Sequence, residues 1–465
     1  MHRGRLFIAL IGIGFALSCI GAQQAAREQF PAVAQTALAP DSGSLAVRCG
    51  SLIDGVADAA VRDRGVVIRG GRIEAVVDAA ELPRDLPRLE LAGFTCLPGL
   101  IDMHTHLTDS PEDTADLRVY FTRSDGEQLE RSKQAAAATL LAGFTTVRDV
   151  GTYVDGADRA LRDAIARGDA IGPRVHVAGA YLTIPNGGGD LYVPGYDEPA
   201  DNARFHAGVA RGAAEFAGKA RANLAAGADL LKVIASGAVL GFGGVPGARE
   251  MTRDEIAAVV EVAHAAGRRV AAHAHGSDSI KDAILAGADT IEHASYVDDE
   301  GIALARDLDV ALAMDVYNGD YIDSEGRRQG WPEEFLRKNL ETTEIQREGF
   351  RRALAAGVPL VYATDAGVYP HGLNARQLRV MVSLGMTPMQ AIQSATSVAA
   401  FYLRAPKTWP EGGKVVHPAF SVGALTAGSF GDLIAVRGDP LANIALLEDV
   451  AVVVRGGLVF KQPAP

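Results

Sequence analysis

The sequence predicts an α/β protein made of a (β/α)8 TIM-like barrel and a small β-sandwich domain built from both ends of the chain. Three observations predict this fold. A long central stretch alternates helical and strand patterns, five of its helices end in Ala-Gly before a short apolar strand, and both ends of the chain are rich in short strands. A chain of 465 residues is long enough for one large domain and a smaller one.

The first residues have the pattern of a targeting segment. The basic start "MHRGR" precedes the apolar run "LFIALIGIGFALS", and small residues follow in "CIGAQQAA". The run is shorter than the roughly 20 residues of a membrane-spanning helix, so residues 1–26 are predicted to be a cleaved secretory signal. The alternative is a lipoprotein anchor at Cys19, although "ALSC" is a poor lipobox. We therefore expect an exported protein, periplasmic in a Gram-negative cell, with no membrane association of the mature form unless Cys19 is lipidated.

The two ends of the mature chain predict one β domain, formed by residues 44–98 and residues 415–463. Apolar residues alternate in both segments, and "VIRGGRIEAV" and "VVRGGLVFK" are near-copies of one hairpin that turns on Gly-Gly. Cys49 and Cys96 are the only cysteines left after signal cleavage. An oxidising compartment permits a disulfide between them, and two buried thiols are the alternative.

Residues 99–405 predict the barrel. The five Ala-Gly segments, such as "LAAGADLLKVIAS" and "HAAGRRVAAHAHG", place a glycine where a helix closes and an apolar strand begins. In "MTRDEIAAVVEVAHAAG", Thr252 is a predicted N-cap with Glu255 three residues later. A doubly wound sheet is the second choice, but no glycine-rich phosphate loop follows the strand in "LPGLIDMH".

The charge of the chain excludes one class of partner. Its formal net charge is −12, with 45 basic and 57 acidic residues, whereas a nucleic-acid-binding protein needs a basic face. We expect a soluble acidic surface and no nucleic-acid partner.

Ionisable residues recur where the predicted barrel strands end, which is where active sites of such barrels lie. Buried strands should not end repeatedly in ionisable groups unless these groups converge on something that satisfies them, and a metal ion satisfies histidines and acids together. His104 and His106 are two apart, so on a strand they face the same way, although an isolated pair of this kind is often a chance turn. The candidate metal ligands, on predicted strands one, four, five, six and eight, are His104, His106, Lys232, His273, His293 and Asp365.

Lys232 lies inside the apolar strand "DLLKVIASG", where a bare ammonium is rarely tolerated. Either it extends to the barrel rim, or it is a neutral amine that has taken up carbon dioxide. Burial lowers the lysine pKa and favours the free amine, and the carbamate, an N6-carboxylysine, can bridge two divalent ions.

Asp365 and His275 are the other candidates for catalysis. Asp365 in "VYATDAG" is either a helix N-cap or a carboxylate that binds one metal and takes a proton from the attacking water. His275 shares a strand face with His273 and is expected to polarise the substrate or to support a ligand. Four further residues just beyond strand ends are candidate substrate contacts, each with loop packing as the alternative: Tyr153, Tyr181, Tyr296 and His371.

Five segments together resemble the amidohydrolase superfamily. In order they are "LPGLIDMHTH", "LLKVIASGAVL", "VAAHAHG", "TIEHASYVDDE" and "TDAGVYPHGLNARQL". They look most like its imidazolonepropionase-related, Xaa-Pro-dipeptidase-like branch. The resemblance implies His104 and His106 on a more buried metal, His273 and His293 on a more exposed metal, and Lys232 as the carbamylated bridge. It also implies Asp365 as both ligand and proton shuttle. Related sequences often carry Gly-Gly-His after strand three, where this chain reads "TIPNGGGDLY", with Gly189 in place of the histidine.

The function expected from these residues and this resemblance is metal-assisted hydrolysis of an amide. Two ions, zinc by resemblance, lower the pKa of a shared water that attacks the carbonyl. The expected substrates are dipeptides or N-acyl amino acids, with an aromatic N-acyl-phenylalanine amide such as ochratoxin or a cyclic amide as alternatives. A mononuclear deaminase and a metal-binding protein without catalysis are competing interpretations; Lys232 argues against the first and Asp365 against the second. Relatives imply a homo-oligomer.

Overall fold

The computed structural model describes residues 41–403 and 421–463 of the chain. The predicted signal segment, residues 1–26, and the alternative lipidation site at Cys19 lie outside the described residues, as do the first positions of the segment 415–463. Within the described ranges, no helix is both long and apolar enough to cross a membrane.

The two ends of the chain meet in one seven-stranded mixed sheet, in the order β14-β13-β12-β4-β1-β2-β3. This is a single hydrogen-bonded sheet, where the sequence had predicted a sandwich. Most neighbours are antiparallel, whereas β1 and β4 run parallel. The strands are β1 (Leu45–Leu52), β2 (Val61–Arg69), β3 (Arg72–Asp78), β4 (Arg88–Pro98), β12 (Leu433–Arg437), β13 (Val452–Arg455) and β14 (Leu458–Lys461).

The turn prediction for this sheet is confirmed, and the state of the two cysteines, which the sequence left open, is decided. Both Gly-Gly pairs, at positions 70–71 and 456–457, have positive φ and join antiparallel strands, as two-residue hairpin turns of this type require. Cys49 of β1 and Cys96 of β4 form a disulfide, so the second of the two alternatives, buried thiols, is wrong for this structure.

Parallel strands form two further sheets, one of three strands (β5-β6-β7) and one of four (β11-β10-β9-β8). Isolated parallel bridges join them on both sides: Leu182 pairs with Val233 of β8, while residues 360–366 pair with both β11 and β5. The predicted eighth strand therefore exists as bridges around Leu360 and Ala366 instead of a continuous strand. The strands are β5 (Leu100–Thr105), β6 (Phe144–Asp149), β7 (Arg174–Val177), β8 (Leu230–Ile234), β9 (Arg269–Ala274), β10 (Thr290–His293) and β11 (Ala311–Ala313).

Helices connect these strands, and their ends follow the sequence signals. The capping box of Thr252 and Glu255 is formed at the start of α7, and all five glycines of the Ala-Gly segments have positive φ. The longer helices are α4 (Asp125–Leu141), α5 (Ala157–Arg167), α6 (Gly212–Ala225), α7 (Arg253–Ala265), α8 (Ser277–Leu285), α9 (Asp299–Asp307), α12 (Glu333–Ala355), α13 (Arg376–Ser383), α14 (Pro388–Ser394) and α15 (Ser397–Leu403). Four short ones are α2 (Pro111–Thr114), α3 (Val119–Thr122), α10 (Asn318–Tyr321) and α11 (Arg327–Gln329).

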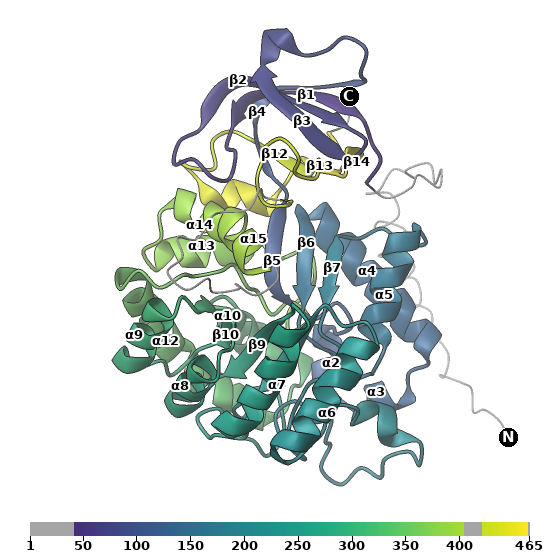
Figure 1. The fold of residues 1–465 in the computed structure, drawn as a ribbon, viewed down its shortest axis with the longest axis vertical. Coiled ribbons are helices and arrows are strands. Elements are labelled where there is room, and N and C mark those ends of the chain that lie inside the picture. The colour runs from purple at the N-terminus through teal and green to yellow at the C-terminus, as the bar shows by residue number, and fades with distance from the viewer. Residues whose placement is uncertain (1–40, 404–420, 464–465) are drawn as a thin grey trace, which may run out of the picture. The chain divides into compact units, whose positions relative to one another are not determined.

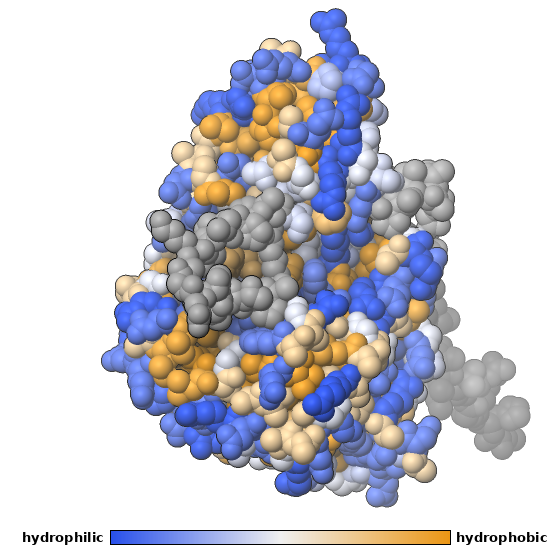
Figure 2. Space-filling model, in the orientation of Figure 1, coloured by the Kyte–Doolittle hydropathy of each residue, from blue (hydrophilic) through white to orange (hydrophobic). Residues whose placement is uncertain are grey.

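The largest hydrophobic core lies between these helices and the parallel strands. Residues such as Leu231 of β8, Val270 of β9 and Val259 of α7 are fully buried in it. Figure 1 shows β5, β6 and β7 side by side, with α4 and α5 along them. On the face drawn in Figure 2, hydrophilic residues are spread over the helices with smaller hydrophobic areas between them, as expected for helices that bury one side.

Candidate metal centre

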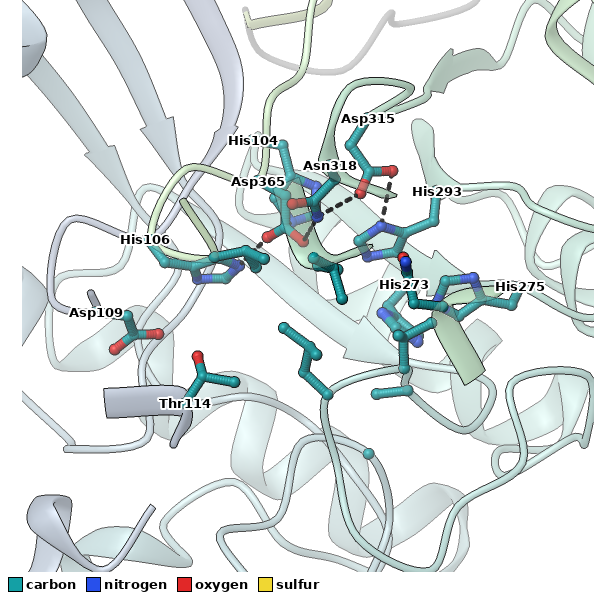
Figure 3. A pocket seen from close by; sticks show the side chains of 18 of the residues that line it. His104, His106, Asp109, Thr114, His273, His275, His293, Asp315, Asn318 and Asp365 are labelled. Carbon is teal, nitrogen blue, oxygen red and sulfur yellow. Dashed lines mark hydrogen bonds and ion pairs between the residues drawn. The ribbon is translucent and has the colours of Figure 1, made fainter. Parts of the chain in front are cut away.

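One cavity gathers the ionisable residues at the carboxyl ends of the parallel strands. The sequence pointed to these ends, and every predicted metal ligand lines the cavity. Figure 3 labels all of these ligands except Lys232. The ionisable lining residues, apart from tyrosines, are His104, His106, Asp109, Lys232, His273, His275, His293, Asp315 and Asp365.

The two histidines of β5 converge on Asp365. Nε2 of His104 lies 3.3 Å and Nε2 of His106 lies 3.2 Å from the Asp365 Oδ1 atom. On the far side of the His104 ring, Nδ1–H donates to Glu292 at 2.7 Å, which fixes the tautomer and leaves Nε2 free to bind a cation.

The Nδ1 atom of His106 has only uncharged hydrogen-bond partners, unlike that of His104. Its Nδ1 lies 3.0 Å from the Gly151 carbonyl oxygen, to which Nδ1–H donates, and 3.0 Å from the Tyr181 hydroxyl. Burial disfavours the charged ring, but the hydrogen bond to Asp365 outweighs burial and raises the pKa of His106 to about 9. A proton between this ring and the carboxylate occupies the place where a shared cation would bind both.

Three other histidines form a second group across the cavity. His273, His275 and His293 offer ring nitrogens within 4.8 Å of one another, and a second set of donors within the same limit comprises His104, His293 and Asp365. The two sets share His293, whose Nδ1 donates to Asp315 at 3.0 Å. The cavity therefore holds two adjacent sets of donors rather than one.

The partners of His273 and His275 are uncharged. His273 Nε2–H donates to the Gly237 carbonyl oxygen at 3.3 Å, and His275 Nδ1 lies 2.8 Å from the Ser295 hydroxyl. Burial, helped by the neighbouring His293, lowers the pKa of His275 to about 3 and holds that of His273 well below its usual value. Both rings are therefore neutral and can offer a lone pair.

Two of the predicted ligands occupy backbone conformations that side chains with a Cβ rarely adopt. His293 has a φ of 66° and Asp365 a φ of 58°. Non-glycine residues in this region cost of order 1 kcal/mol or more each and cluster at functional sites. The strained backbone at these two residues lowers the free energy of unfolding, and it turns both side chains into the cavity.

Lys232 enters the cavity from β8 and is 1% exposed. It forms no ion pair with any described residue, and burial lowers its pKa to about 8. A neutral amine is the form that reacts with carbon dioxide, so the environment suits the carbamate that the sequence predicted.

Together these donors fit divalent cations. They are nitrogen and oxygen atoms without sulfur, they lie in two adjacent sets, and the imidazoles of His104 and His273 have lowered pKa values because they are buried. Burial would raise the pKa of Asp365, but its contacts with the β5 histidines outweigh burial and hold the carboxylate ionised.

The predicted substrate contacts divide into two groups. Tyr153, Tyr181 and His275 line the cavity, whereas Tyr296 and His371 do not. The His371 ring instead donates to the backbone carbonyl oxygens of the β5–α2 loop, at 3.2 Å.

Gly189 lines the cavity at the position where related sequences carry a histidine. A Cβ added there would lie 2.6 Å from the Ile234 side chain and 2.9 Å from Tyr181. The loop has closed over this space, so no side chain from position 189 reaches a substrate here.

Sequence reasoning missed the carboxylates behind the ligands. Glu292 precedes His293 on β10 and accepts hydrogen bonds from His104 and from Arg148. Asp315 follows β11 in "AMDVYN" and is a strand-end acid like those already identified, so the same signal could have found it. Asn318 donates to both Asp315 and Asp365 at 3.0 Å, a link that no local motif marks.

Comparisons with known proteins point to one family. The model of the amidohydrolase family matches residues 95–459. Ochratoxinase of Aspergillus niger is 28% identical over 435 residues, covering 87% of this chain and 84% of that protein. Among solved structures, a Xaa-Pro dipeptidase with bound methionine has a TM-score of 0.79 and 32% identity, covering 90% of this chain and all of the other. A prolidase complexed with N-methylphosphonate-L-proline has a TM-score of 0.79 and 27% identity, with coverage of 90% and 100%.

Proposed function

The chain belongs to the amidohydrolase family, and from this premise we propose that it is a metal-dependent hydrolase that cleaves the amide bond of a dipeptide or an N-acyl amino acid. The observation that carries the proposal is the convergence of five histidines, Asp365 and a buried lysine in one cavity at the strand ends. The Xaa-Pro dipeptidase and prolidase structures support the choice of bond. We infer that the bridged parallel strands form the closed eight-stranded barrel of this family.

The proposed cofactors are two divalent metal ions, zinc being favoured, and carbon dioxide bound as a carbamate on Lys232. His104 and His106 would hold one ion and His273 and His293 the other, with Lys232 between them and Asp365 on the first. When bound, such ions supply a Lewis acid and a water of lowered pKa. The donor chemistry supports zinc without excluding manganese, cobalt or iron.

The protein side chains position the reactants and move the proton. Asp365 is ionised and stands beside both β5 histidines, so Oδ1 can accept the proton of the attacking water and deliver it to the leaving nitrogen. His275 is neutral and turned into the cavity, where a ring nitrogen can orient the substrate carbonyl or its developing oxyanion.

A second substrate class is favoured by one observation, the similarity to ochratoxinase over most of both chains. We keep the aromatic N-acyl-phenylalanine amide as the alternative substrate on that ground. A cyclic amide is a further alternative, because the strand-end residues alone do not distinguish a ring amide from an open one.

One experiment tests the proposal and ranks the substrates. The purified protein is loaded with zinc in bicarbonate buffer and offered dipeptides, N-acyl amino acids, an N-acyl-phenylalanine amide and a cyclic amide. We expect hydrolysis of an open amide that a chelator abolishes and added zinc restores. Turnover that survives complete metal removal would contradict the proposal.

We also propose that the protein acts outside the cytoplasm. The Cys49–Cys96 disulfide supports this, because such bonds persist in oxidising compartments. Fractionation of expressing cells, followed by sequencing of the mature N-terminus, tests both export and cleavage of the signal segment.

A further inference from the structure

The cavity wall beside the β5 histidines carries a carboxylate that the proposed chemistry does not use. We propose that Asp109, with the rings of Tyr120 and Tyr153, forms a subsite that binds a positively charged nitrogen of the substrate. The inference rests on the proposed function and narrows it to amides that carry an ammonium or guanidinium group.

Asp109 lines the cavity, and its carboxylate forms no ion pair with any described residue, although the charge of the nearby His106 ring acts on it. Figure 3 shows it near His106, across the cavity from His273 and His275. The Thr108 hydroxyl donates to it at 3.2 Å, and the Tyr120 hydroxyl also hydrogen-bonds to it. A partly buried carboxylate whose direct hydrogen bonds come only from neutral donors is costly to keep charged, and a cationic ligand would supply an ion-pair partner.

The nearby acid Asp113 shows the contrast within the same segment. Its carboxylate is 3% exposed and pairs with Arg123 at 2.5 Å and with Arg131 at 3.4 Å. The fold thus neutralises the acid that faces the protein and leaves the acid that faces the cavity unpaired. This difference is expected if the partner of Asp109 arrives with the substrate.

Aromatic rings extend from Asp109 toward the β5 histidines. The Tyr120 and Tyr153 ring centroids are 5.4 Å apart, and those of Tyr153 and Tyr181 are 5.1 Å apart. All three tyrosines line the cavity. Aromatic faces attract alkylammonium and guanidinium groups, so a carboxylate beside a row of tyrosines is suited to a cation and poorly suited to an anion.

The other residues that line the cavity also favour a cationic over an anionic ligand at Asp109. Lys232 is the single lysine or arginine among the described residues that line the cavity, and it belongs to the metal centre. No lysine or arginine side chain is therefore present at the Asp109 wall to pair with a substrate carboxylate. A negatively charged group would be excluded from this wall and directed toward the metal centre.

Matched substrates test the subsite. One pair is a dipeptide and its N-acetyl derivative, which differ in the α-ammonium; the other is an N-acyl dipeptide ending in lysine or in norleucine, which differ in the side-chain charge. We expect the kcat/KM of wild-type protein to be at least tenfold higher for the charged member of at least one pair. The pair that shows this preference identifies whether the subsite binds the α-ammonium or the side-chain ammonium. Asp109→Asn should remove that preference, mainly through KM, and leave the neutral member within about twofold.

The control is Asp116→Asn, which removes one negative charge from the same segment at an exposed carboxylate already paired with Arg118. It should leave both preferences unchanged. Equal losses for charged and neutral substrates in Asp109→Asn, or no preference in wild-type protein, would overturn the subsite. Such results leave the proposed function intact, because that function fails only if chelator-sensitive amide hydrolysis is absent.

A binding measurement tests the subsite independently of turnover. Benzyltrimethylammonium is a cation with no lone pair for a metal, and benzyl alcohol is a neutral comparison. Calorimetry should show that the cation binds wild-type protein and Asp116→Asn alike, and at least tenfold more weakly to Asp109→Asn. Tyr153→Leu, which leaves Asp109 in place, should also weaken it severalfold. Equal binding by wild-type and Asp109→Asn proteins with unchanged thermal unfolding would refute the proposal.

Discussion

The cavity contains two His-X-His pairs that are alike in sequence and differ in what supports them. His104 and His106 end β5, while His273 and His275 end β9. In the β5 pair, both Nε2 atoms point to the carboxylate of Asp365. In the β9 pair, the two rings contact each other edge-on at 4.7 Å, and no described carboxylate lies within hydrogen-bond distance of either.

The two histidine pairs also differ in the groups that accept hydrogen bonds from, or donate them to, the outer ring nitrogens. His104 is backed by Glu292, a buried carboxylate that also accepts from Arg148 at 2.8 Å. His275 is backed by the Ser295 hydroxyl alone. A charged acceptor raises the basicity of a ligand histidine more than a neutral one does. Spacing brings each pair of histidines to one place, and the residues behind the two pairs differ. We expect that difference to decide whether a pair binds a metal tightly or leaves one ring for the substrate.

The largest effect is expected where both pairs depend on one residue. Lys232→Ala removes the proposed bridge, so we expect loss of at least one metal ion and a fall in kcat/KM of about a thousandfold or more. Metal analysis and turnover measure the two effects, and a short carboxylic acid should restore part of the activity. Full activity in the variant would rule out a shared bridge.

Lys338 provides the matched control for that variant. It is also 1% exposed, but its ammonium pairs with Glu334 and donates to the Gly241 carbonyl oxygen, both at 2.7 Å. Lys338→Met should therefore keep its metal content, whatever it costs in stability. The two lysines are equally buried and differ in that Lys338 has an acid partner, whereas Lys232 forms no ion pair with any described residue.

His275→Asn separates the two roles within the β9 pair. If His275 orients the substrate, as proposed, kcat falls by about 100-fold to 1000-fold while both metal ions stay bound. Loss of one metal ion would instead make both β9 histidines ligands and remove the asymmetry between the pairs. Metal content measured on the same sample as kcat decides between these outcomes.

Glu292→Gln and Ser295→Ala compare the supporting groups directly. The first replaces a charged acceptor with a neutral one, and we expect a loss of metal affinity of about 10-fold to 100-fold. It also leaves Arg148 buried without its counter-ion, at a cost of about 3 kcal/mol in the free energy of unfolding. Ser295→Ala should change metal affinity by no more than a few fold. Equal losses from the two variants would contradict the proposed difference between the pairs.

Much of this centre was predictable because each ligand ends an apolar strand. His104, Lys232 and Asp365 lie within buried, largely apolar segments, and an ionisable group in such a segment is visible from the sequence alone. The helix signals were equally local: Thr252 and Glu255 lie three residues apart, so their capping box needs no knowledge of the rest of the fold.

The remainder depends on contacts between distant residues. Glu292 and His104 are 188 positions apart, and Asn318 and Asp365 are 47 apart, so no local pattern connects them. Asp109 could be recognised as a pocket residue only once Tyr120 and Tyr153 were placed beside it. The eighth strand was predicted from its apolar run, yet residues 360–366 form isolated bridges and scattered backbone hydrogen bonds with their neighbours instead of a continuous ladder.

The smallest expected effect lies within the β5 pair itself. Tyr181→Phe removes the hydroxyl that lies 3.0 Å from His106 Nδ1, but the Gly151 carbonyl oxygen still accepts from that atom. One neutral hydrogen bond contributes about 1 kcal/mol, so metal affinity should fall by about fivefold at most. Burial raises the pKa of Tyr181 well above its usual value, so its hydroxyl stays protonated and the variant should not change the pH profile near neutrality. A fall in kcat with unchanged metal affinity would mean that the hydroxyl acts on the substrate rather than on His106, and the β5 side of the cavity would then contribute to substrate binding as well as to the metal.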